Sequence, residues 1–273
     1  MIFIGWVISI VFNSRLIFYL SIFLAIIFNF ISYYYSDKLV ITMTGAKPLD
    51  QKEFPQIYKI VENLSITAGI KMPKLYVMET PMLNAFATGR NEENSAVVFT
   101  RGILNLLDKS EIEGVIAHEL SHIKNKDILV GTVAAIAVSF ISIIVDFAFR
   151  SWWFSSQKEE REINPVVLVL LILGIILAPI IAQLIQLAIS RQREFLADSS
   201  GALLTRYPEG LANALMKISQ RPTVNVPQSF SHLFIVNPFK ADQKNQKTPW
   251  YIKIWLTHPP VEERIARLLG RKI

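Results

Sequence analysis

The sequence predicts a mostly α-helical integral membrane protein with a small β-sheet, and two kinds of pattern support this fold class. Windows 16–36, 128–145 and 165–190 contain no charged residue, and about 20 apolar residues suffice to cross a bilayer as a helix. Elsewhere, apolar residues recur at helical spacing or form short strand-like runs. An ordinary soluble globular protein and a disordered chain are therefore both excluded.

Hydropathy divides the chain into four segments. Residues 1–36 form an N-terminal membrane anchor with one clear span at 16–35. A first soluble part covers 37–127, a transmembrane hairpin covers 128–190, and a second soluble part covers 191–273. The sequence thus predicts one soluble domain that is split by a membrane hairpin.

Residues 1–14 are ambiguous in this division. As a helix they would extend about 21 Å, which is less than a hydrocarbon core of about 30 Å. They form a tilted short span, an interfacial helix or the upper part of one long helix. They contain no basic residue and no small-residue cleavage site follows the apolar run, so we expect a retained anchor rather than a cleaved signal peptide.

Composition limits the partners and the chemistry. The chain is 52% hydrophobic and 18% charged, and 28 Lys and Arg against 22 Asp and Glu give a formal net charge of +6. Basic residues that flank membrane spans account for such an excess, and no dense basic patch indicates nucleic acid as a partner. The chain has no cysteine, which excludes disulfides, thiolate ligands and cysteine nucleophiles.

The soluble parts contain recognisable helices and strands. Helical spacing predicts helices at 56–68, 208–219 and 260–269, and strand-like runs occupy 74–78, 85–88 and 96–100. A further helix is expected to begin at Ser110, because Glu113 follows three residues later as in a capping box. That helix runs towards Asn125.

The helix that begins near Ser110 carries a metal-binding pattern. His118, Glu119 and His122 form an H-E-x-x-H motif, and residues four apart share one face of a helix. Both imidazoles can then bind one zinc ion, while the glutamate reaches a water molecule on the metal. The motif predicts a catalytic Zn²⁺ site with Glu119 as the general base.

A catalytic zinc usually has three protein ligands and one open position. Two further histidines, His232 and His258, and the carboxylates are the available choices for the third ligand. Glu194 and Asp198 would lie on one face if the last membrane helix continues into water. Glu194 could then bind zinc and Asp198 could accept the other ring N–H of a histidine ligand, although the spacing equally fits an exposed, charged helix end.

Five segments resemble one known family in order along the chain. They are 84–89, 118–122, 193–198, 232–238 and 257–264, and together they are similar to the HtpX-type membrane zinc endopeptidases, relatives of the CAAX prenyl-protein endopeptidases. The resemblance covers essentially the whole chain. It implies an α+β, gluzincin-like zinc metalloprotease domain that is split by a transmembrane hairpin.

The resemblance also implies roles for individual residues. It makes Glu194 the third ligand beside His118 and His122. His258 faces the active site with Arg264 nearby, and both are expected to donate hydrogen bonds to the oxyanion. The segment at 84–88 lines the cleft and accepts the substrate as an added strand; its residues are Asn84, Ala85, Phe86, Ala87 and Thr88.

The sequence therefore predicts a membrane-anchored zinc endopeptidase. By resemblance it cleaves misfolded or damaged membrane proteins on the cytosolic side of the cell membrane, in protein quality control and the stress response. Prenyl-protein processing is a weaker alternative, because three or four spans cannot enclose the chamber of those relatives. A non-enzymatic metal-binding membrane scaffold or sensor is a second alternative, but it would have no need for Glu119 between the histidines.

Overall fold

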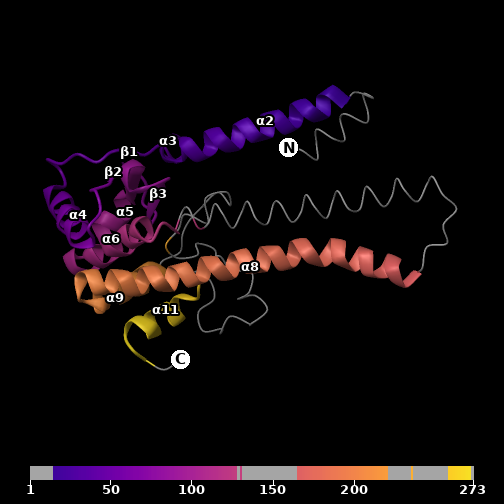
Figure 1. Cartoon of the computed structure of the whole chain (residues 1–273). Helices are drawn as coiled ribbons and strands as arrows, with labels where there is room; N and C mark the ends of the chain where they lie inside the picture. The colour runs from indigo at the N-terminus through magenta and orange to yellow at the C-terminus, as the bar shows by residue number, and fades with distance from the viewer. Residues whose placement is uncertain (1–14, 128–129, 131–164, 221–234, 236–257, 272–273) are drawn as a thin grey trace.

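The computed structural model describes residues 15–127, 130, 165–220, 235 and 258–271. The predicted first arm of the hairpin, the ambiguous N-terminal segment and His232 lie outside these residues. In the described part, a body of helices packed on a small sheet carries two long helices that extend away from it in the same direction (Figure 1).

The sheet has four strands in the order β1-β2-β4-β3. Strands β2 (Lys74–Met78) and β4 (Ser95–Thr100) pair in parallel, whereas β1 (Lys47–Pro48) and β3 (Ala85–Gly89) pair antiparallel with them. Three of these strands are the predicted ones within one residue. Strand β1 was not predicted, because it is only two residues long and one of them is proline.

Strand β4 lies inside the sheet and β3 forms one edge of it. Every residue of β4 is buried, which agrees with its run of β-branched and aromatic residues. The strands are joined by a tight connection in which Gly89 adopts φ +126 and approaches the carbonyl of Asn94. A Cβ at Gly89 would lie 2.1 Å from that oxygen, so only glycine fits there.

Helix α6 (Lys109–Lys124) is the centre of the body. It packs against strand β3 and against three helices, α4 (Pro55–Ala68), α8 (Pro165–Thr205) and α9 (Pro208–Ser219). Such a helix has to be apolar on several sides, and its fully buried residues are Val115, Ile116, Ala117 and Leu120. The remaining short helices are α5 (Arg101–Leu106) and α11 (Val261–Leu268).

The predicted start of α6 is wrong by two residues. Asp108, not Ser110, is the N-cap: its side chain accepts from the Glu111 amide, and the Glu111 side chain accepts from the Asp108 amide. Both S-x-x-E and D-x-x-E patterns occur in this segment, and both have the spacing of a capping box. Ser110 is already helical and donates its hydroxyl to Asp108.

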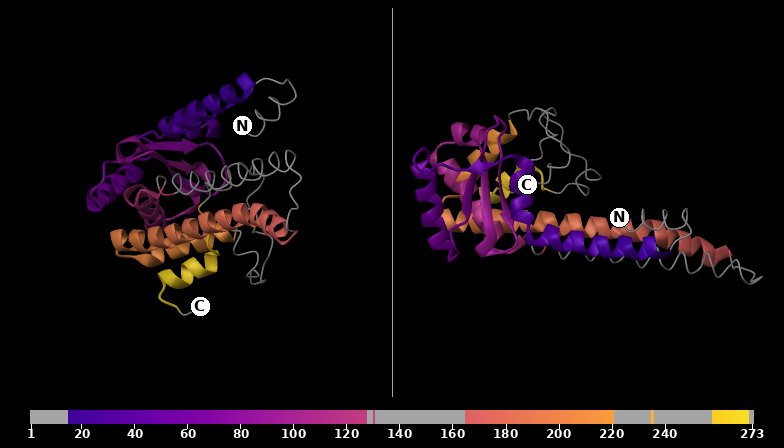
Figure 2. Two further views of the ribbon diagram at one scale, coloured as in Figure 1. Left: turned by 45° about the vertical axis from the view of Figure 1, so that its right-hand side comes forward. Right: turned by 90° about the horizontal axis from the view of Figure 1, so that it is seen from above.

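Helix α8 confirms the prediction that the helix with Glu194 continues through Ser190 without a break. It runs unbroken for 41 residues, and its sequence from 181 to 200 contains neither glycine nor proline. Its C-terminal third packs against the body, and its N-terminal part extends beyond it (Figures 1 and 2).

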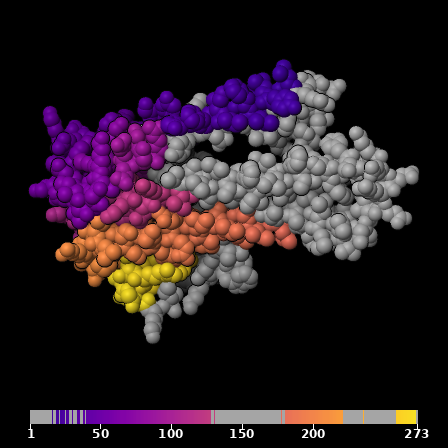
Figure 3. Space-filling view, viewed as in Figure 1, coloured from indigo at the N-terminus to yellow at the C-terminus, as the bar shows by residue number. Residues whose placement is uncertain are grey.

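The second long helix, α2 (Arg15–Tyr34), joins the body through α3 (Ser36–Thr44). Arg90, at the end of β3, donates to the carbonyl of Tyr34 and lies over its ring, which fixes the base of α2 beside the sheet. In the space-filling view α2 projects from the body (Figure 3). Its exposed large apolar side chains are Leu16, Tyr19, Leu20, Phe23, Leu24, Ile26, Ile27, Phe30 and Tyr34.

Over the residues that the structure describes, no helix is both long enough and apolar enough to be identified as a membrane span. The spans predicted at 16–35 and within 128–190 therefore stay predictions. The mostly helical protein with a small sheet is confirmed.

Close packing of α6 on α9 depends on Gly114. A Cβ at this position would lie 2.5 Å from the backbone nitrogen of Leu211 and 2.9 Å from its Cα. Backbone atoms cannot move aside as a flexible side chain would, so any larger residue has to separate the two helices.

We expect Gly114→Ala to lower the free energy of unfolding by about 1–3 kcal/mol, the usual cost of overpacking. This loss should appear although alanine is intrinsically favoured over glycine in a helix by about 1 kcal/mol. Denaturant unfolding of the purified chain measures it. Lys109→Ala, at an exposed position of the same helix, is the control, and equal stability of the two variants would show that the α6–α9 contact tolerates a methyl group.

Candidate metal centre

Helix α6 presents two histidines on one face. His118 and His122 lie one helical turn apart, with ring centroids separated by 4.6 Å and Nε2 atoms separated by 3.1 Å. This is the arrangement that a spacing of four residues predicts. Both Nε2 atoms point to the same place, where one metal ion can contact both.

Glu194 of α8 completes a group of three ligand atoms. Its Oε2 lies 3.7 Å from Nε2 of His118, and its Oε1 lies 3.6 Å from Nε2 of His122. One ligand atom from each residue lies within 4.8 Å of the others. The structure therefore brings together the three residues that the sequence predicted as ligands, from two helices that are about 75 residues apart in the chain.

The donor set fits a divalent metal ion. Glu194 Oε2 is buried and accepts no hydrogen bond from the described residues; its nearest cation is Nη1 of Arg264, at 3.3 Å as an ion pair, so the oxygen keeps lone pairs that could bind a metal ion. Burial alone would raise the pKa of Glu194, but the positive charges of His258 and Arg264 hold it well below its usual value. The group is thus an ionised carboxylate next to two imidazoles, a common ligand set of catalytic zinc.

The packing of α8 on α6 is close at this point. A Cβ at Gly201 of α8 would lie 3.0 Å from the backbone nitrogen of His118. The absence of a side chain at Gly201 allows α8 to approach the helix turn that carries the first histidine. Gly201 thereby helps to set the distance between Glu194 and the histidines.

Asp198 and Arg264 hold the ring of His118. Asp198 Oδ1 lies 3.0 Å from His118 Nδ1, and Arg264 binds both oxygens of Asp198, at 2.8 and 2.7 Å. Burial would raise the pKa of Asp198, but Arg264 and His118 lower it to about 2. The ionised Asp198 lies beside Nδ1 as an ion-pair partner, without the geometry of a hydrogen bond. A carboxylate on that side of the ring favours the state in which the Nε2 lone pair can bind a metal, and contact with a histidine ligand is one of the two interpretations that the spacing in the sequence allows.

A second carboxylate, Asp127, holds the ring of His122, and the sequence analysis missed it. Its Oδ2 lies 2.6 Å from His122 Nδ1, and its Oδ1 accepts from Arg193. Burial would lower the pKa of His122, but Asp127 and Glu194 raise it to about 9. The sequence pattern that indicates such a partner is a carboxylate five residues after the second histidine. Asp127 has this position, at the end of the predicted first soluble part.

Glu119 lies in the wall of the same site. Its side chain is buried, and burial together with the nearby Glu194 raises its pKa, although His118 and His122 act in the opposite direction. The backbone N–H of Ala87 also hydrogen bonds to it. The carboxylate therefore lies between the histidine helix and strand β3, next to the ligand group.

His258 also reaches the centre. Its Nδ1 lies 3.2 Å from Glu194 Oε1, and its Nε2 is buried without a hydrogen-bond partner among the described residues. His258 is not part of the three-residue ligand group. It lies beside the third ligand, with one ring nitrogen available for another molecule.

Arg264 lies closer to the ligands than the sequence suggested. Its side chain has no exposed surface, and its guanidinium contacts Asp198, the carbonyl of Ile235, Glu194 and the Nε2 of His118. Its shortest contacts, at 2.7–2.8 Å, engage three of its N–H groups with Asp198 and the Ile235 carbonyl. The geometry favours a positioning role for Arg264 over the predicted direct hydrogen bond to the oxyanion.

Asn84 supports this network from the start of β3. Its side-chain oxygen accepts from the amide of Ile235 at 3.0 Å, and the carbonyl of Ile235 accepts from Arg264 at 2.8 Å. Asn84 is itself buried. The next residues, Ala85–Thr88, form the edge strand whose backbone contacts Glu119. The structure thus places the predicted substrate-binding segment beside the metal centre.

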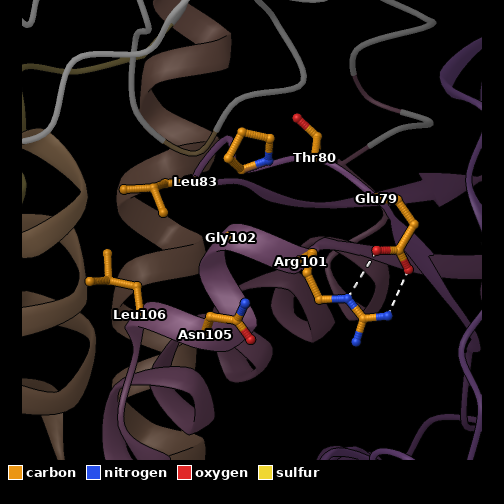
Figure 4. A pocket seen from close by; sticks show the side chains of 8 residues that line it. Glu79, Thr80, Leu83, Arg101, Gly102, Asn105 and Leu106 are labelled. Carbon is orange, nitrogen blue, oxygen red and sulfur yellow. Dashed lines mark hydrogen bonds and ion pairs between the residues drawn. The ribbon is translucent and has the colours of Figure 1, made fainter.

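A separate surface pocket of about 540 Å³ lies between the end of β2 and α5. Arg101 in its wall is bound by Glu79 at 3.0 and 2.7 Å (Figure 4). The residues that line it include none of the three metal-ligand candidates and not Glu119. The catalytic chemistry is therefore to be sought at the histidines rather than in this pocket.

The site defines a class of protein. Two histidines one turn apart, a glutamate between them and a carboxylate from a second helix are the arrangement of a metallopeptidase. Comparison with known sequences identifies the family: residues 51–272 match peptidase family M48, and the chain belongs to that family. It is therefore a metalloendopeptidase, and the non-enzymatic scaffold is excluded.

Individual relatives agree with this assignment. The chain is 46% identical to a protein named Protease HtpX homolog from Pyrococcus furiosus over 92% of this chain and 84% of that one, and 46% identical to the homolog from Methanocaldococcus jannaschii over 92% and 87%. The predicted resemblance is thus confirmed. The crystal structure of S. mikatae Ste24p matches with a TM-score of 0.60 at 20% sequence identity. The match includes 97% of this chain and 61% of the Ste24p chain, and it shows a shared fold.

Removal of the Arg264 side chain should destabilise the protein strongly. In Arg264→Ala, Asp198 and Glu194 would remain buried without their cationic partner, which typically costs about 3–5 kcal/mol. Thermal or denaturant unfolding in the presence of a chelator measures this loss without a metal contribution. Arg271→Ala is the control, because Arg271 lies shortly after the same helix and is exposed; similar losses in both variants would contradict the account.

Proposed function

We propose that this metalloendopeptidase uses one Zn²⁺ ion that is held by His118, His122 and Glu194. The observation that carries the proposal is the convergence of their three ligand atoms within 4.8 Å of one another. Two histidines and a glutamate are a known ligand set of catalytic zinc and leave a fourth position for water or substrate. When bound, zinc supplies a water of lowered pKa and polarises the scissile carbonyl.

Glu119 is the general base of this proposal. It takes a proton from the attacking water and later passes it to the leaving amine. Its burial raises its pKa towards the range in which a carboxylate both accepts and returns a proton. The hydrogen bond from the Ala87 amide holds the carboxylate between the histidines and the edge strand.

His258 is proposed to stabilise the oxyanion of the tetrahedral state, because its buried Nε2 has no partner in the described part of the chain. Arg264 acts indirectly, through the carboxylates of Asp198 and Glu194. In this proposal His258 donates a hydrogen bond to the reacting group, and Arg264 keeps the metal ligands in place.

The substrate is proposed to bind as an additional strand along β3. An edge strand offers unpaired backbone groups to an extended peptide, and β3 is an edge of the sheet. The contact between Ala87 and Glu119 would place the scissile bond next to the base. Asn84 would then support the strand indirectly: its side-chain oxygen accepts a hydrogen bond from the Ile235 amide, and it would not contact the substrate.

We further propose that the enzyme is a multi-pass protein of the cell membrane with its active site facing the cytosol, and that it cleaves misfolded or damaged membrane proteins. Exposed apolar residues on α2 and on the part of α8 before Glu194 support contact with lipid; those on that part of α8 are Leu177, Ile180, Ile181 and Ile185. Processing of prenylated proteins has no comparable support, because the likeness to Ste24p concerns the fold alone.

Glu119→Gln tests the chemistry. The substitution removes the base but leaves the three ligands, so we expect normal zinc content and a loss of peptidase activity of about 10²–10⁴-fold. Turnover of an unfolded membrane-protein substrate by the purified chain, together with its metal content, gives both values. Glu113→Gln on the same helix is the control, and activity near the wild-type level in Glu119→Gln would assign the base elsewhere.

Glu194→Ala tests the third ligand. Loss of a carboxylate that contacts the metal directly should lower zinc affinity by more than the about 10–100-fold that is typical for outer partners. Zinc content after dialysis against a chelator measures it, with Gln192→Ala on the same helix as the control. Full retention of zinc would point to His258 as the third ligand instead.

A further inference from the structure

We propose that Asp127 and Arg193 are positioning residues that orient His122 for metal binding and set the register between the two ligand-bearing helices. This inference rests on the proposed role of His122 as a metal ligand. Neither residue received a role from the sequence. Both follow from the contacts that meet at the C-terminal end of α6.

Asp127 is placed by an unusual turn of the backbone. Helix α6 ends at Lys124, and Lys126 then adopts φ 56 in the left-handed region, which is uncommon for a residue other than glycine. Beyond it, the amide of Val130 donates to the carbonyl of Lys126. The reversal brings the carboxylate of Asp127 back to within 2.6 Å of His122 Nδ1.

That contact selects one state of the His122 ring. A carboxylate at Nδ1 accepts its proton, which leaves the lone pair of Nε2 for the metal and prevents the ring from turning. In this structure Nε2 of His122 indeed faces His118 and Glu194. Asp127 therefore does for the second histidine what Asp198 does for the first.

Arg193 fixes Asp127 in turn. Its guanidinium donates to Oδ1 of Asp127 and to the backbone carbonyl of Asn125, the C-cap of α6. A cation at this position also interacts favourably with the negative end of the helix dipole. Arg193 directly precedes Glu194 on α8, so the contact that holds Asp127 also holds α8 in register with α6.

Asp127 and Arg193 could also form an ion pair that only joins α6 to α8. The geometry allows this structural role to be separated from the orientation of His122. Only the carboxylate of Asp127 contacts His122, whereas either order of charges would join α6 to α8. The exchanged pair Asp127→Arg with Arg193→Asp should therefore restore the joining of the helices but not the hydrogen bond to the imidazole. It would place a cation beside Nδ1 instead.

The test uses the purified full-length chain and measures zinc affinity by competition with a chelator, the absorption spectrum of the Co²⁺-substituted protein, and unfolding of the metal-free protein. We expect Asp127→Ala to lower zinc affinity about 10–100-fold and to alter the Co²⁺ bands. Arg193→Gln should lower it less, because Asp127 stays in place. Asp127→Asn, whose amide oxygen still accepts from Nδ1–H, should recover part of the loss.

Arg101→Gln is the matched control, since Arg101 is as exposed as Arg193, at 27% against 25%, and also binds carboxylates. It should leave zinc affinity unchanged. Without metal, the exchanged pair should be more stable than Asp127→Ala but less stable than the wild type, because the exchange also removes the contact of Arg193 with the Asn125 carbonyl, and it should still bind zinc weakly. Wild-type zinc affinity in Asp127→Ala, or its full recovery in the exchanged pair, would overturn the inference.

One further variant separates this inference from the proposed function. If His122→Ala keeps zinc, His122 is not a ligand and the proposed metal site is wrong. If His122→Ala loses zinc while Asp127→Ala retains it, the metal site stands and only the positioning role fails.

Discussion

The buried guanidinium of Arg264 is the interaction on which the rest of the site depends. Two carboxylates, Asp198 and Glu194, are ionised although they are buried, and an uncompensated buried charge costs several kcal/mol. The positive charge of Arg264 offsets the negative charges of both carboxylates, and its guanidinium also donates a hydrogen bond to the carbonyl of Ile235. A single side chain of the last helix thereby joins α11 to α8, to the histidine helix and, through Asn84, to the edge strand. The cost of burying these charges is offset only when all of these segments are in place, so the metal centre and the fold form together.

The two imidazoles are supported in parallel but unequal ways. His118 is held by Asp198 and a fully buried arginine, deep in the body, whereas His122 is held by Asp127 and a quarter-exposed arginine at the end of α6. Loss of either member of the deeper pair would leave a buried charge without its partner, so this pair is also needed for stability. The outer pair lies where the chain enters the segment that we predict to be a membrane hairpin.

Local patterns were sufficient to predict most of the fold, and the metal ligands followed partly from spacing and partly from resemblance. Helix α9 and strand β2 match their predicted bounds, because apolar spacing and the bounding turn residues are encoded locally. The cap of α6 was misplaced because Asp108 and Ser110, two positions apart, both satisfy the same rule, and only the backbone conformation of Asp108 decides between them. Asp127 and the true partners of Arg264 could not be predicted, since their contacts join segments 66 residues apart or depend on a left-handed turn at Lys126. Tertiary hydrogen bonds of this kind leave no periodic signal in the sequence.

The continuity of α8 has a mechanical consequence for the proposed function. Because the helix is unbroken from Pro165 to Thr205, Glu194 and the apolar part of the helix belong to one rigid element. At about 1.5 Å of rise per residue, a span that begins near Val166 and crosses about 30 Å of hydrocarbon would place Glu194 about 12–16 Å above the membrane edge. A segment of a membrane protein would then have to be drawn out by only a few extended residues to reach the metal. The rigid helix would fix the height of the centre above the membrane, while the Arg264 network fixes its internal geometry, so that the enzyme would select substrates by how far they emerge from the lipid rather than by side-chain sequence alone.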